Sequence, residues 1–330
     1  MDMKIFNLGK NTAEKEQEAE PEKQAEPEPE PYDLIIIGGG PGGYSAAIYA
    51  ARYNLRAIVL ARELGAISES PHVENYPGIE SISGMELMQR FQKHAEKLGI
   101  ETKYVDVTDI KKGFTLFNVT DSEENVYKGK AILLAIGMEK RRLDIENEKN
   151  YEGRGISYCA TCDAAFYKDK VAAVLGGNDT AARYALVLAE FASKVYIVYR
   201  GERLRAEPML LENVKNNPKI EVITNDMVIK IKGEGKVEGA ILKSGKELAV
   251  DGIFVAIGAV PNSRLAGKLG IALDEQGYIK VDASQQTSLP GVFAAGDVTN
   301  FGVKQVITAA AQGAVAAHFI NDILKERKEE

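Results

Sequence analysis

The sequence has few cysteines and no long apolar run. Of its 330 residues only Cys159 and Cys162 are cysteine, which excludes a scaffold held by several disulfides. It contains no stretch of 18 uninterrupted apolar residues, and its N-terminus lacks the basic, apolar and small-residue order of a signal peptide. We therefore expect a cytoplasmic protein with no membrane-spanning segment.

A net positive charge is also absent. The formal net charge is −7, which argues against nucleic acid or an anionic membrane as a partner. Residues 1–32 hold nine acidic residues against four lysines, a net charge of −5. Residues 11–31 contain no large apolar side chain to offset the entropy lost on ordering. We predict that residues 1–31 form a flexible acidic extension; a docking tail for a basic partner is the alternative.

An order of strand, glycine-rich turn, helix and strand occurs twice. The first copy predicts strands at 34–37 and 57–60 around a helix over 44–52. In the second copy a strand at 172–175 leads to a helix through Glu190 and a strand at 195–199. Two further segments, 132–137 and 253–258, resemble each other and close the two copies. The length suits about two domains, and the repeat predicts two β-α-β nucleotide-binding modules.

The first glycine-rich turn has the G-x-G-x-x-G pattern, formed by Gly38, Gly40 and Gly43. Glycine there permits a tight turn, close approach of the backbone to a pyrophosphate and close packing of the helix, whose N-terminus favours phosphate. A predicted strand over 287–297 ends in Gly296 and Asp297 and precedes a helix over 305–324. A carboxylate there can accept hydrogen bonds from sugar-alcohol hydroxyls. The alternative is that Asp297 only shapes the start of the helix.

The two cysteines form the pattern Cys159-Ala-Thr-Cys162. Such a dithiol can close a small disulfide and exchange it with another disulfide, with a thiolate as the nucleophile. Asp163 follows directly and is placed to carry a proton. A zinc site needs four ligands, and the three histidines are scattered, so we predict no metal site. An inert buried pair is the other alternative.

The second glycine-rich turn, which begins at Gly176, departs from the usual pattern. Asn178 stands where the second glycine belongs. We expect the tolerance of Asn for left-handed backbone to preserve the turn, while its side chain crowds the pyrophosphate. A turn kept only for packing is the alternative. Arg200 and Arg205 follow the second strand and suit a 2′-phosphate, so NADPH is favoured over NADH.

The block Cys159-Ala-Thr-Cys162-Asp163, the run GVFAAGD ending at Asp297, and the segment ENYPG that begins at Glu74 resemble low-molecular-weight thioredoxin reductases, a class of pyridine nucleotide-disulfide oxidoreductases. The similarity runs from about residue 32 to 324. It implies an α/β fold of two Rossmann-like, three-layer ββα domains, with the second inserted into the first. The FAD-binding domain would comprise 32–138 and 264–330, and the NADPH-binding domain with the redox pair would comprise 139–263.

The resemblance also implies an activity. Electrons would pass from NADPH through FAD and the cysteine pair to a disulfide of a thioredoxin- or glutaredoxin-like protein, in a homodimer. Cys162 would lie nearest the flavin and Cys159 would attack the partner. Because the nicotinamide and the cysteine pair must both reach one flavin, we expect domain rotation about 137–142 and 261–266. The alternatives are a flavin-dependent dithiol oxidase, a reductase fed by NADH or reduced ferredoxin, and a flavin-binding redox sensor.

The candidate cofactor residues form two sets. For FAD they are Gly38, Gly40, Pro41, Gly43, Asn75, Gly137, Gly296, Asp297, Lys304, Gln305 and Val306. For NADPH they are Gly176, Asn178, Asp179, Thr180, Arg200, Arg205 and Gly258. Where many members of the family have Gly-Gly-Gln-Leu, this chain has Leu64-Gly-Ala-Ile67, so we expect a glutamine contact to FAD to be missing.

Overall fold

The computed structural model describes residues 30–70, 72–143, 145, 148–151 and 153–329. The predicted acidic extension, residues 1–31, lies outside these ranges except for Glu30 and Pro31. The described residues from 31 onward form one compact unit that contains two large sheets with parallel cores, each the centre of one lobe of the chain.

The first sheet has seven strands built around β1 (Tyr32–Gly39). β1 pairs in parallel with both of its neighbours, and a parallel order continues outward on each side. An antiparallel pair, β4 and β5, extends the edge beyond β6. The other strands are β2 (Ala57–Leu64), β3 (Glu101–Tyr104), β4 (Val107–Lys112), β5 (Phe117–Asp121), β6 (Val126–Leu134) and β17 (Val292–Ala294).

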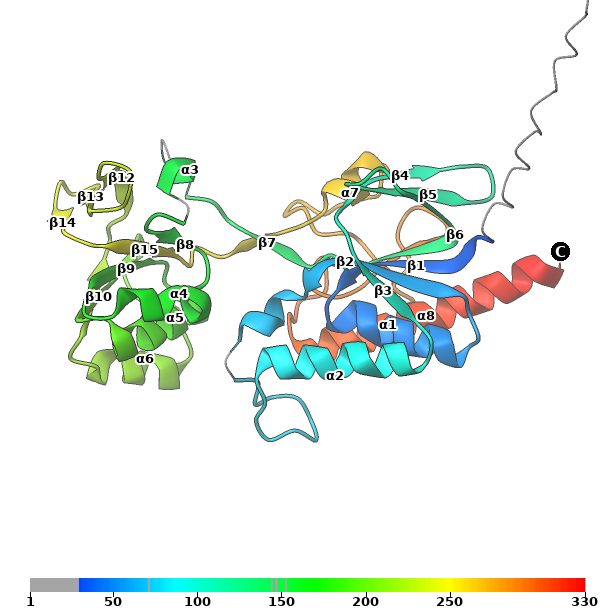
Figure 1. Ribbon diagram of the computed structural model, residues 1–330, viewed down its shortest axis with the longest axis horizontal. Helices are drawn as coiled ribbons and strands as arrows, with labels where there is room; N and C mark the ends of the chain where they lie inside the picture. The colour runs from blue at the N-terminus through cyan, green and yellow to red at the C-terminus, as the bar shows by residue number, and fades with distance from the viewer. Residues whose placement is uncertain (1–29, 71, 144, 146–147, 152, 330) are drawn as a thin grey trace, which may run out of the picture. The chain divides into compact units, whose positions relative to one another are not determined.

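Side chains of β1 alternate between two cores. Leu34 and Ile36 pack with the helices, and Ile35 and Ile37 pack on the opposite face of the sheet. All four are at most 4% exposed, as expected for a central parallel strand that is covered on both faces. The helices that cover one face are α1 (Pro41–Arg52), α2 (Gly84–Lys97) and α8 (Val306–Glu329) (Figure 1).

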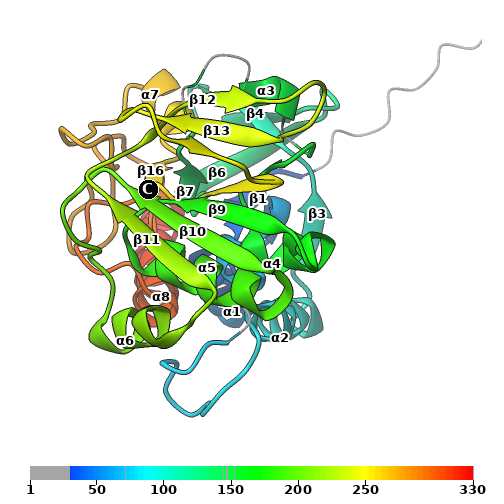
Figure 2. The ribbon, with the colours of Figure 1, turned by 90° about the vertical axis from the view of Figure 1, so that its left-hand side faces the viewer.

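The second sheet is parallel, in the order β11-β10-β9-β15-β8. Figure 2 shows α5 (Asp179–Phe191) and α6 (Pro208–Asn216) on one face of this sheet and β12 and β13 on the other. The parallel strands are β8 (Ile156–Ser157), β9 (Val171–Leu175), β10 (Lys194–Tyr199), β11 (Ile220–Thr224) and β15 (Gly252–Val255). The antiparallel strands of the outer layer are β12 (Val228–Lys232), β13 (Gly239–Leu242) and β14 (Glu247–Leu248).

Two short strands connect the two lobes. β7 (Met138–Lys140) leaves the first sheet and pairs antiparallel with β16 (Ala259–Pro261), which leads back to it. β17 then pairs with β6, and α8 packs on α1. The remaining short elements are η1 (Ala66–Glu69), α3 (Glu148–Tyr151), α4 (Ala160–Asp163), η2 (Ala164–Tyr167) and α7 (Arg264–Lys268).

The predicted α/β class is confirmed, and the central strands of both large sheets are parallel, but one predicted strand is wrong. Instead of spanning 287–297, β17 covers only Val292–Ala294. Pro290 has no N–H to donate to a ladder, and Gly291 has a φ of 85° that turns the chain. The helix predicted over 305–324 is present as α8.

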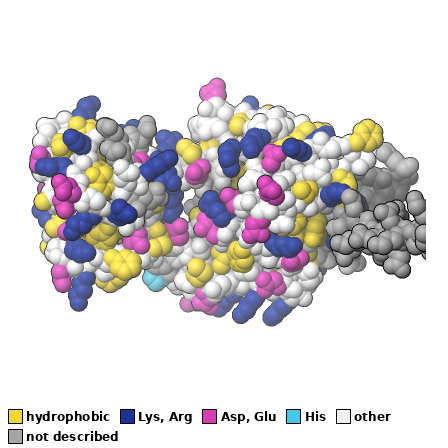
Figure 3. All heavy atoms as spheres, turned by 45° about the horizontal axis from the view of Figure 1, so that its top comes forward, with side chains coloured by type: hydrophobic (Ala, Val, Ile, Leu, Met, Phe, Trp, Pro, Cys, Tyr) yellow, Lys and Arg dark blue, Asp and Glu magenta, His cyan; other side chains and the backbone are white. Residues whose placement is uncertain are grey.

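The surface carries both signs of charge. Lys or Arg and Asp or Glu side chains are interspersed over the face drawn in Figure 3. Within the residues that the structure describes, no helix combines the length and the apolar character needed to cross a bilayer.

Candidate active site

The first glycine-rich turn joins β1 to α1. Gly38 has a φ of 117°, and a Cβ atom on it would lie 2.2 Å from the carbonyl oxygen of Ala135. A Cβ on Gly43 would lie 2.0 Å from the carbonyl oxygen of Gly38. Gly40 is the N-cap of α1 and has no side chain to cap it. The turn therefore requires glycine for packing at two positions and leaves the helix N-terminus open at the third.

A cavity of about 1120 Å³ lies against this turn. Every predicted FAD residue except Gly43 lines it, from Gly38 at the turn to Val306 at the start of α8. Gly65, Ala66 and Ile67 also line it, in the segment where we expect no glutamine contact to FAD. The glycine cradle fits a dinucleotide, and the volume lies just above the range of about 300–1,000 Å³ that is common for ligand cavities, so it leaves room for a ligand of that size.

Asp297 is a partly buried charged residue in the lining of this cavity. Removal from water raises its pKa, and the charge of Lys304 opposes that shift. Lys304 donates a 2.5 Å hydrogen bond to the carbonyl oxygen of Thr299, and its ammonium group lies 4.3 Å from the centre of the Tyr278 ring. Burial in turn lowers the pKa of Lys304. Asp297 is thus a desolvated acceptor beside a fixed cation, a costly arrangement unless a ligand hydroxyl satisfies it.

Other lining residues were not predicted. Glu63 lies near the carboxyl end of β2 and lines the cavity, where an acidic side chain commonly binds ribose hydroxyls. The spacing between Gly38 and Glu63 in the sequence is the feature that could have predicted this position of Glu63. Asn75 was predicted, but its contact was not: its side-chain amide donates a 3.0 Å hydrogen bond to the Gln305 side chain.

The redox pair forms a disulfide at the start of the second lobe. The Sγ atoms of Cys159 and Cys162 are 2.09 Å apart. Cys159 is the N-cap of α4, and its Sγ accepts a 3.2 Å hydrogen bond from the Cys162 amide. The Ser157 hydroxyl makes two hydrogen bonds to the backbone of Cys159. Its Oγ accepts from the Cys159 amide at 3.0 Å and donates to the Cys159 carbonyl oxygen at 3.2 Å. Cys162 is exposed and Cys159 half-buried.

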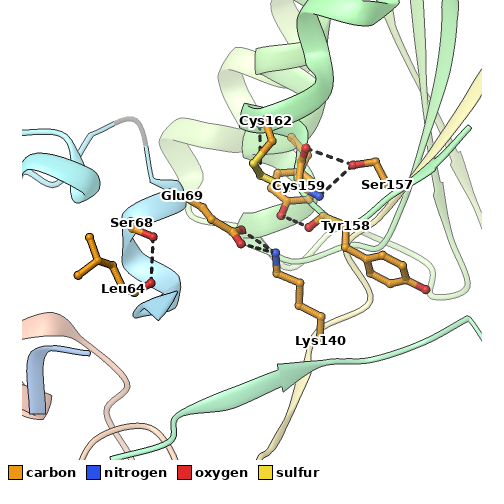
Figure 4. Close-up of a disulfide and its surroundings, with 9 residues drawn as sticks. Leu64, Ser68, Glu69, Lys140, Ser157, Tyr158, Cys159 and Cys162 are labelled. Atoms are coloured by element: carbon orange, nitrogen blue, oxygen red, sulfur yellow. Dashed lines mark hydrogen bonds and ion pairs between the residues drawn. A yellow bond between two sulfur atoms is a disulfide. The ribbon is translucent and has the colours of Figure 1, made fainter. Parts of the chain in front are cut away.

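Figure 4 shows an ion pair beside this disulfide. Lys140 of β7 donates hydrogen bonds to both carboxylate oxygens of Glu69 in η1, at 2.6 and 2.8 Å. No group of three or more His, Cys, Asp or Glu side chains in the described part of the chain is arranged to hold a metal ion. His318 lies on α8, where its ring contacts Tyr53 and Phe319.

The second glycine-rich turn repeats the geometry of the first. Gly176 has a φ of 146°, and a Cβ on it would lie 2.2 Å from the carbonyl oxygen of Ala256. Asn178 has φ −101° and ψ −176°, against −88° and −177° at Gly40. The turn is preserved as expected, but the expected reason is wrong, because this backbone is extended rather than left-handed.

The Asn178 side chain occupies the helix N-terminus instead. Its Oδ1 accepts a 3.0 Å hydrogen bond from the Ala181 amide, which is the N-cap interaction that stabilises a helix start. Asp179 and Thr180 line the same cavity as the FAD residues. Arg200 and Arg205 are exposed beyond β10, and Gly258 follows β15 with a φ of 95°. Neither cysteine lines that cavity.

Two nucleotide-binding turns with a CxxC disulfide at the start of the second module define a flavin- and nicotinamide-dependent disulfide oxidoreductase. The family model for pyridine nucleotide-disulphide oxidoreductases matches residues 32–313, and the chain belongs to this family.

The relatives identify the branch of the family. The chain is 38% identical over 306 residues to a thioredoxin reductase of Bacillus subtilis, covering 90% of this chain and 96% of that one. It is 41% identical over 295 residues to a thioredoxin reductase of Streptomyces coelicolor, covering 86% and 91%. The crystal structure of Lactococcus lactis thioredoxin reductase in its FR conformation matches with a TM-score of 0.84 and 36% identity, covering 89% of this chain and 99% of that one. The prediction of an FAD- and NADPH-dependent thioredoxin reductase is confirmed, and the alternatives are not favoured.

The burial of Asp297 predicts a conflict between stability and binding. Its folded pKa lies above its unfolded pKa, so the carboxyl group favours the fold at low pH, and this contribution is lost as pH rises through the folded pKa. Asp297→Asn should therefore stabilise the FAD-free protein at neutral pH and weaken FAD binding by about 10-fold or more, the value of a hydrogen bond to a charged group. Thermal unfolding of the FAD-free protein and titration with FAD measure the two effects. Unchanged FAD affinity would contradict the assignment.

The Asn178 cap predicts that a substitution at the second turn will strengthen nucleotide binding. Asn178→Gly frees the Ala181 amide for a phosphate oxygen at a cost of only a few tenths of a kcal/mol in helix capping. Affinity for NADP⁺ should rise by about 10-fold or more, the value of a hydrogen bond to a charged phosphate group. Calorimetric titration checks this, and weaker binding of NADP⁺ by the variant would show that the side chain assists the nucleotide.

Proposed function

We propose that this chain reduces a disulfide of a thioredoxin- or glutaredoxin-like protein through the Cys159–Cys162 pair. The observation that carries the proposal is the Cys162 amide, which donates to Sγ of Cys159 at 3.2 Å. Such a donor stabilises negative charge on sulfur once the pair is reduced. The relatives support the substrate class, since they are named thioredoxin reductases.

The cavity residues would hold FAD by two kinds of contact. The open N-terminus of α1, which begins at Pro41, would offer the backbone N–H groups of Gly40 and Gly42 to the pyrophosphate, since Pro41 itself has none. Asp297 would accept a hydrogen bond from a ribityl hydroxyl, and the Asn75–Gln305 hydrogen bond links two segments that line the cavity. Bound FAD supplies the two-electron relay between the nicotinamide and the disulfide.

The cysteines divide the exchange between them. After reduction, the Cys159 thiolate attacks a sulfur of the partner's disulfide, forming a mixed disulfide and releasing one partner thiolate. The Cys162 thiolate then attacks Cys159, which closes the Cys159–Cys162 bond and releases the second partner thiolate. Asp163, whose amide donates to the Cys159 carbonyl oxygen at 3.3 Å, carries the proton between the leaving thiolate and solvent.

Single substitutions test these roles. Cys162→Ser should trap a mixed disulfide between Cys159 and thioredoxin, because the resolving thiol is missing. Cys159→Ser should trap none. Non-reducing electrophoresis and mass spectrometry of the adduct give the result. Trapping through Cys162 alone would reverse the roles, and no adduct with either variant would contradict a thioredoxin-type substrate.

The proposed boundaries place the FAD-binding domain at 32–138 and 264–330 and the NADPH-binding domain at 139–263. The β7–β16 pair at the two crossings, and the pairing of β17 with β6, support this division. Rotation about 137–142 and 261–266 is supported by the cavity lining, since Asp179 and Thr180 line the FAD cavity whereas the cysteines do not. The disulfide needs another arrangement to approach the flavin.

Spin labels test the rotation. In the oxidised protein both native cysteines are in the disulfide, so labels attach only to introduced thiols. Lys97→Cys in α2 and Lys230→Cys in β12 replace one exposed residue of each lobe. Two inter-label distance populations, with proportions that change when NADP⁺ is added, are expected from electron–electron resonance. A single unchanged distance would contradict rotation.

A homodimer is supported by an aromatic surface on α1 and α8. The rings of Tyr49, Tyr53, His318 and Phe319 form a continuous series with neighbouring centroids 5.3–6.3 Å apart. Tyr49 and Phe319 are each 40% exposed, and exposed aromatic groups of this kind are enriched in interfaces. A cytoplasmic location stays a prediction.

Sedimentation of Phe319→Glu tests the assembly. A charge within the aromatic surface should shift the protein toward the monomer, because a buried unpaired carboxylate is costly. Phe166→Glu is the control, since Phe166 is 72% exposed in the second lobe and should leave the dimer intact. Equal sedimentation of both variants as dimers would place the interface elsewhere.

A further inference from the structure

Tyr199, the last residue of β10, packs its ring against two glycines. A Cβ atom on Gly177 would lie 2.5 Å from the ring, and one on Gly201 would lie 2.6 Å from it. Neither position accepts a side chain while the ring stays there. Gly177 belongs to the second glycine-rich turn and Gly201 to the basic segment after β10. The ring therefore lies between the turn and the segment, at the carboxyl end of the sheet.

Two hydrogen bonds, one from its backbone and one from its side chain, fix Arg205 beside the Tyr199 ring. Its backbone amide donates a 2.5 Å hydrogen bond to the carbonyl oxygen of Gly177. Its Nε donates a 2.8 Å hydrogen bond to the hydroxyl oxygen of Tyr199. The backbone contact sets where the residue lies, and the phenol restricts the long side chain, which otherwise loses much rotamer freedom on binding a ligand.

The chemistry of this guanidinium suits a phosphate. The contact with Tyr199 uses Nε, while the two terminal nitrogens are the pair that binds an oxyanion end-on with two hydrogen bonds. The carboxyl end of the second strand of a dinucleotide-binding module is where the 2′ position of the adenosine ribose is recognised. Gly201 itself has no side chain, so the recognition of a 2′-phosphate falls on Arg200 and Arg205.

We propose that Tyr199 is a positioning residue that orients Arg205 and thereby sets the preference for a nucleotide with a 2′-phosphate. This inference rests on the proposed NADPH site. It also explains Gly201, because the Tyr199 ring leaves no room for a Cβ atom at that position.

Tyr199→Phe tests the proposal, because it removes the hydroxyl acceptor and keeps the ring. Calorimetric titration of the FAD-loaded, oxidised protein with NADP⁺ and NAD⁺ measures binding without turnover. The variant should bind NADP⁺ about 3- to 10-fold more weakly, the value of one hydrogen bond, and bind NAD⁺ as the wild type does. In turnover, KM for NADPH should rise by a similar factor with kcat unchanged. Tyr196→Phe is the matched control, since Tyr196 lies on the same strand and its hydroxyl interacts with Lys194.

A double substitution separates positioning from a general effect. Arg205→Ala should abolish most of the preference for NADP⁺, and adding Tyr199→Phe should cause no further loss if the tyrosine acts through the arginine. Additive losses, or an equal loss for NADP⁺ and NAD⁺, would overturn the inference. If the wild type prefers NADP⁺ and the Tyr199→Phe variant keeps the same preference, the inference about Tyr199 is overturned while the proposed NADPH site stands. A wild type that binds neither nucleotide would overturn the proposed NADPH site as well.

Discussion

The site depends on the close approach of each glycine-rich turn to the end of a neighbouring strand. The Ala135 amide donates to the carbonyl oxygen of Ile37 at 2.8 Å, and the Ala256 amide donates to that of Leu175 at the same distance. Each following glycine, Gly38 or Gly176, would place a Cβ atom 2.2 Å from a carbonyl oxygen. Only glycine fits there. The close approach that glycine permits places the N-terminus of the following helix at the carboxyl edge of each sheet.

The two glycine-rich turns can be compared directly. Gly40 and Asn178 share one backbone conformation, so the difference between them lies in the side chain alone. At the first turn the helix N-terminus has no side-chain cap, which suits tight binding of a resident pyrophosphate. At the second turn Asn178 caps the helix. A phosphate must replace or share this interaction, as suits a nucleotide that binds and leaves in each catalytic cycle.

Most of the architecture could be predicted from local patterns, because glycine spacing and apolar strands have short-range causes. The strands around Leu34 and Val174 and the turns after them lie where the pattern predicts. The long strand ending at Asp297 was wrong because Pro290 and Gly291 end the pairing early. The contact of Tyr199 with Gly177 could not be predicted from the sequence, because it joins residues from different elements through packing.

The whole mechanism requires a bound flavin and the Cys159–Cys162 disulfide to exchange two electrons within this chain. Anaerobic addition of NADPH to the oxidised, FAD-loaded protein, followed by counting of free thiols, tests it most directly. We expect loss of the flavin absorbance, with both cysteines becoming reactive thiols once reduction is complete. Flavin reduction with the disulfide intact, or no reduction by NADPH, would contradict it.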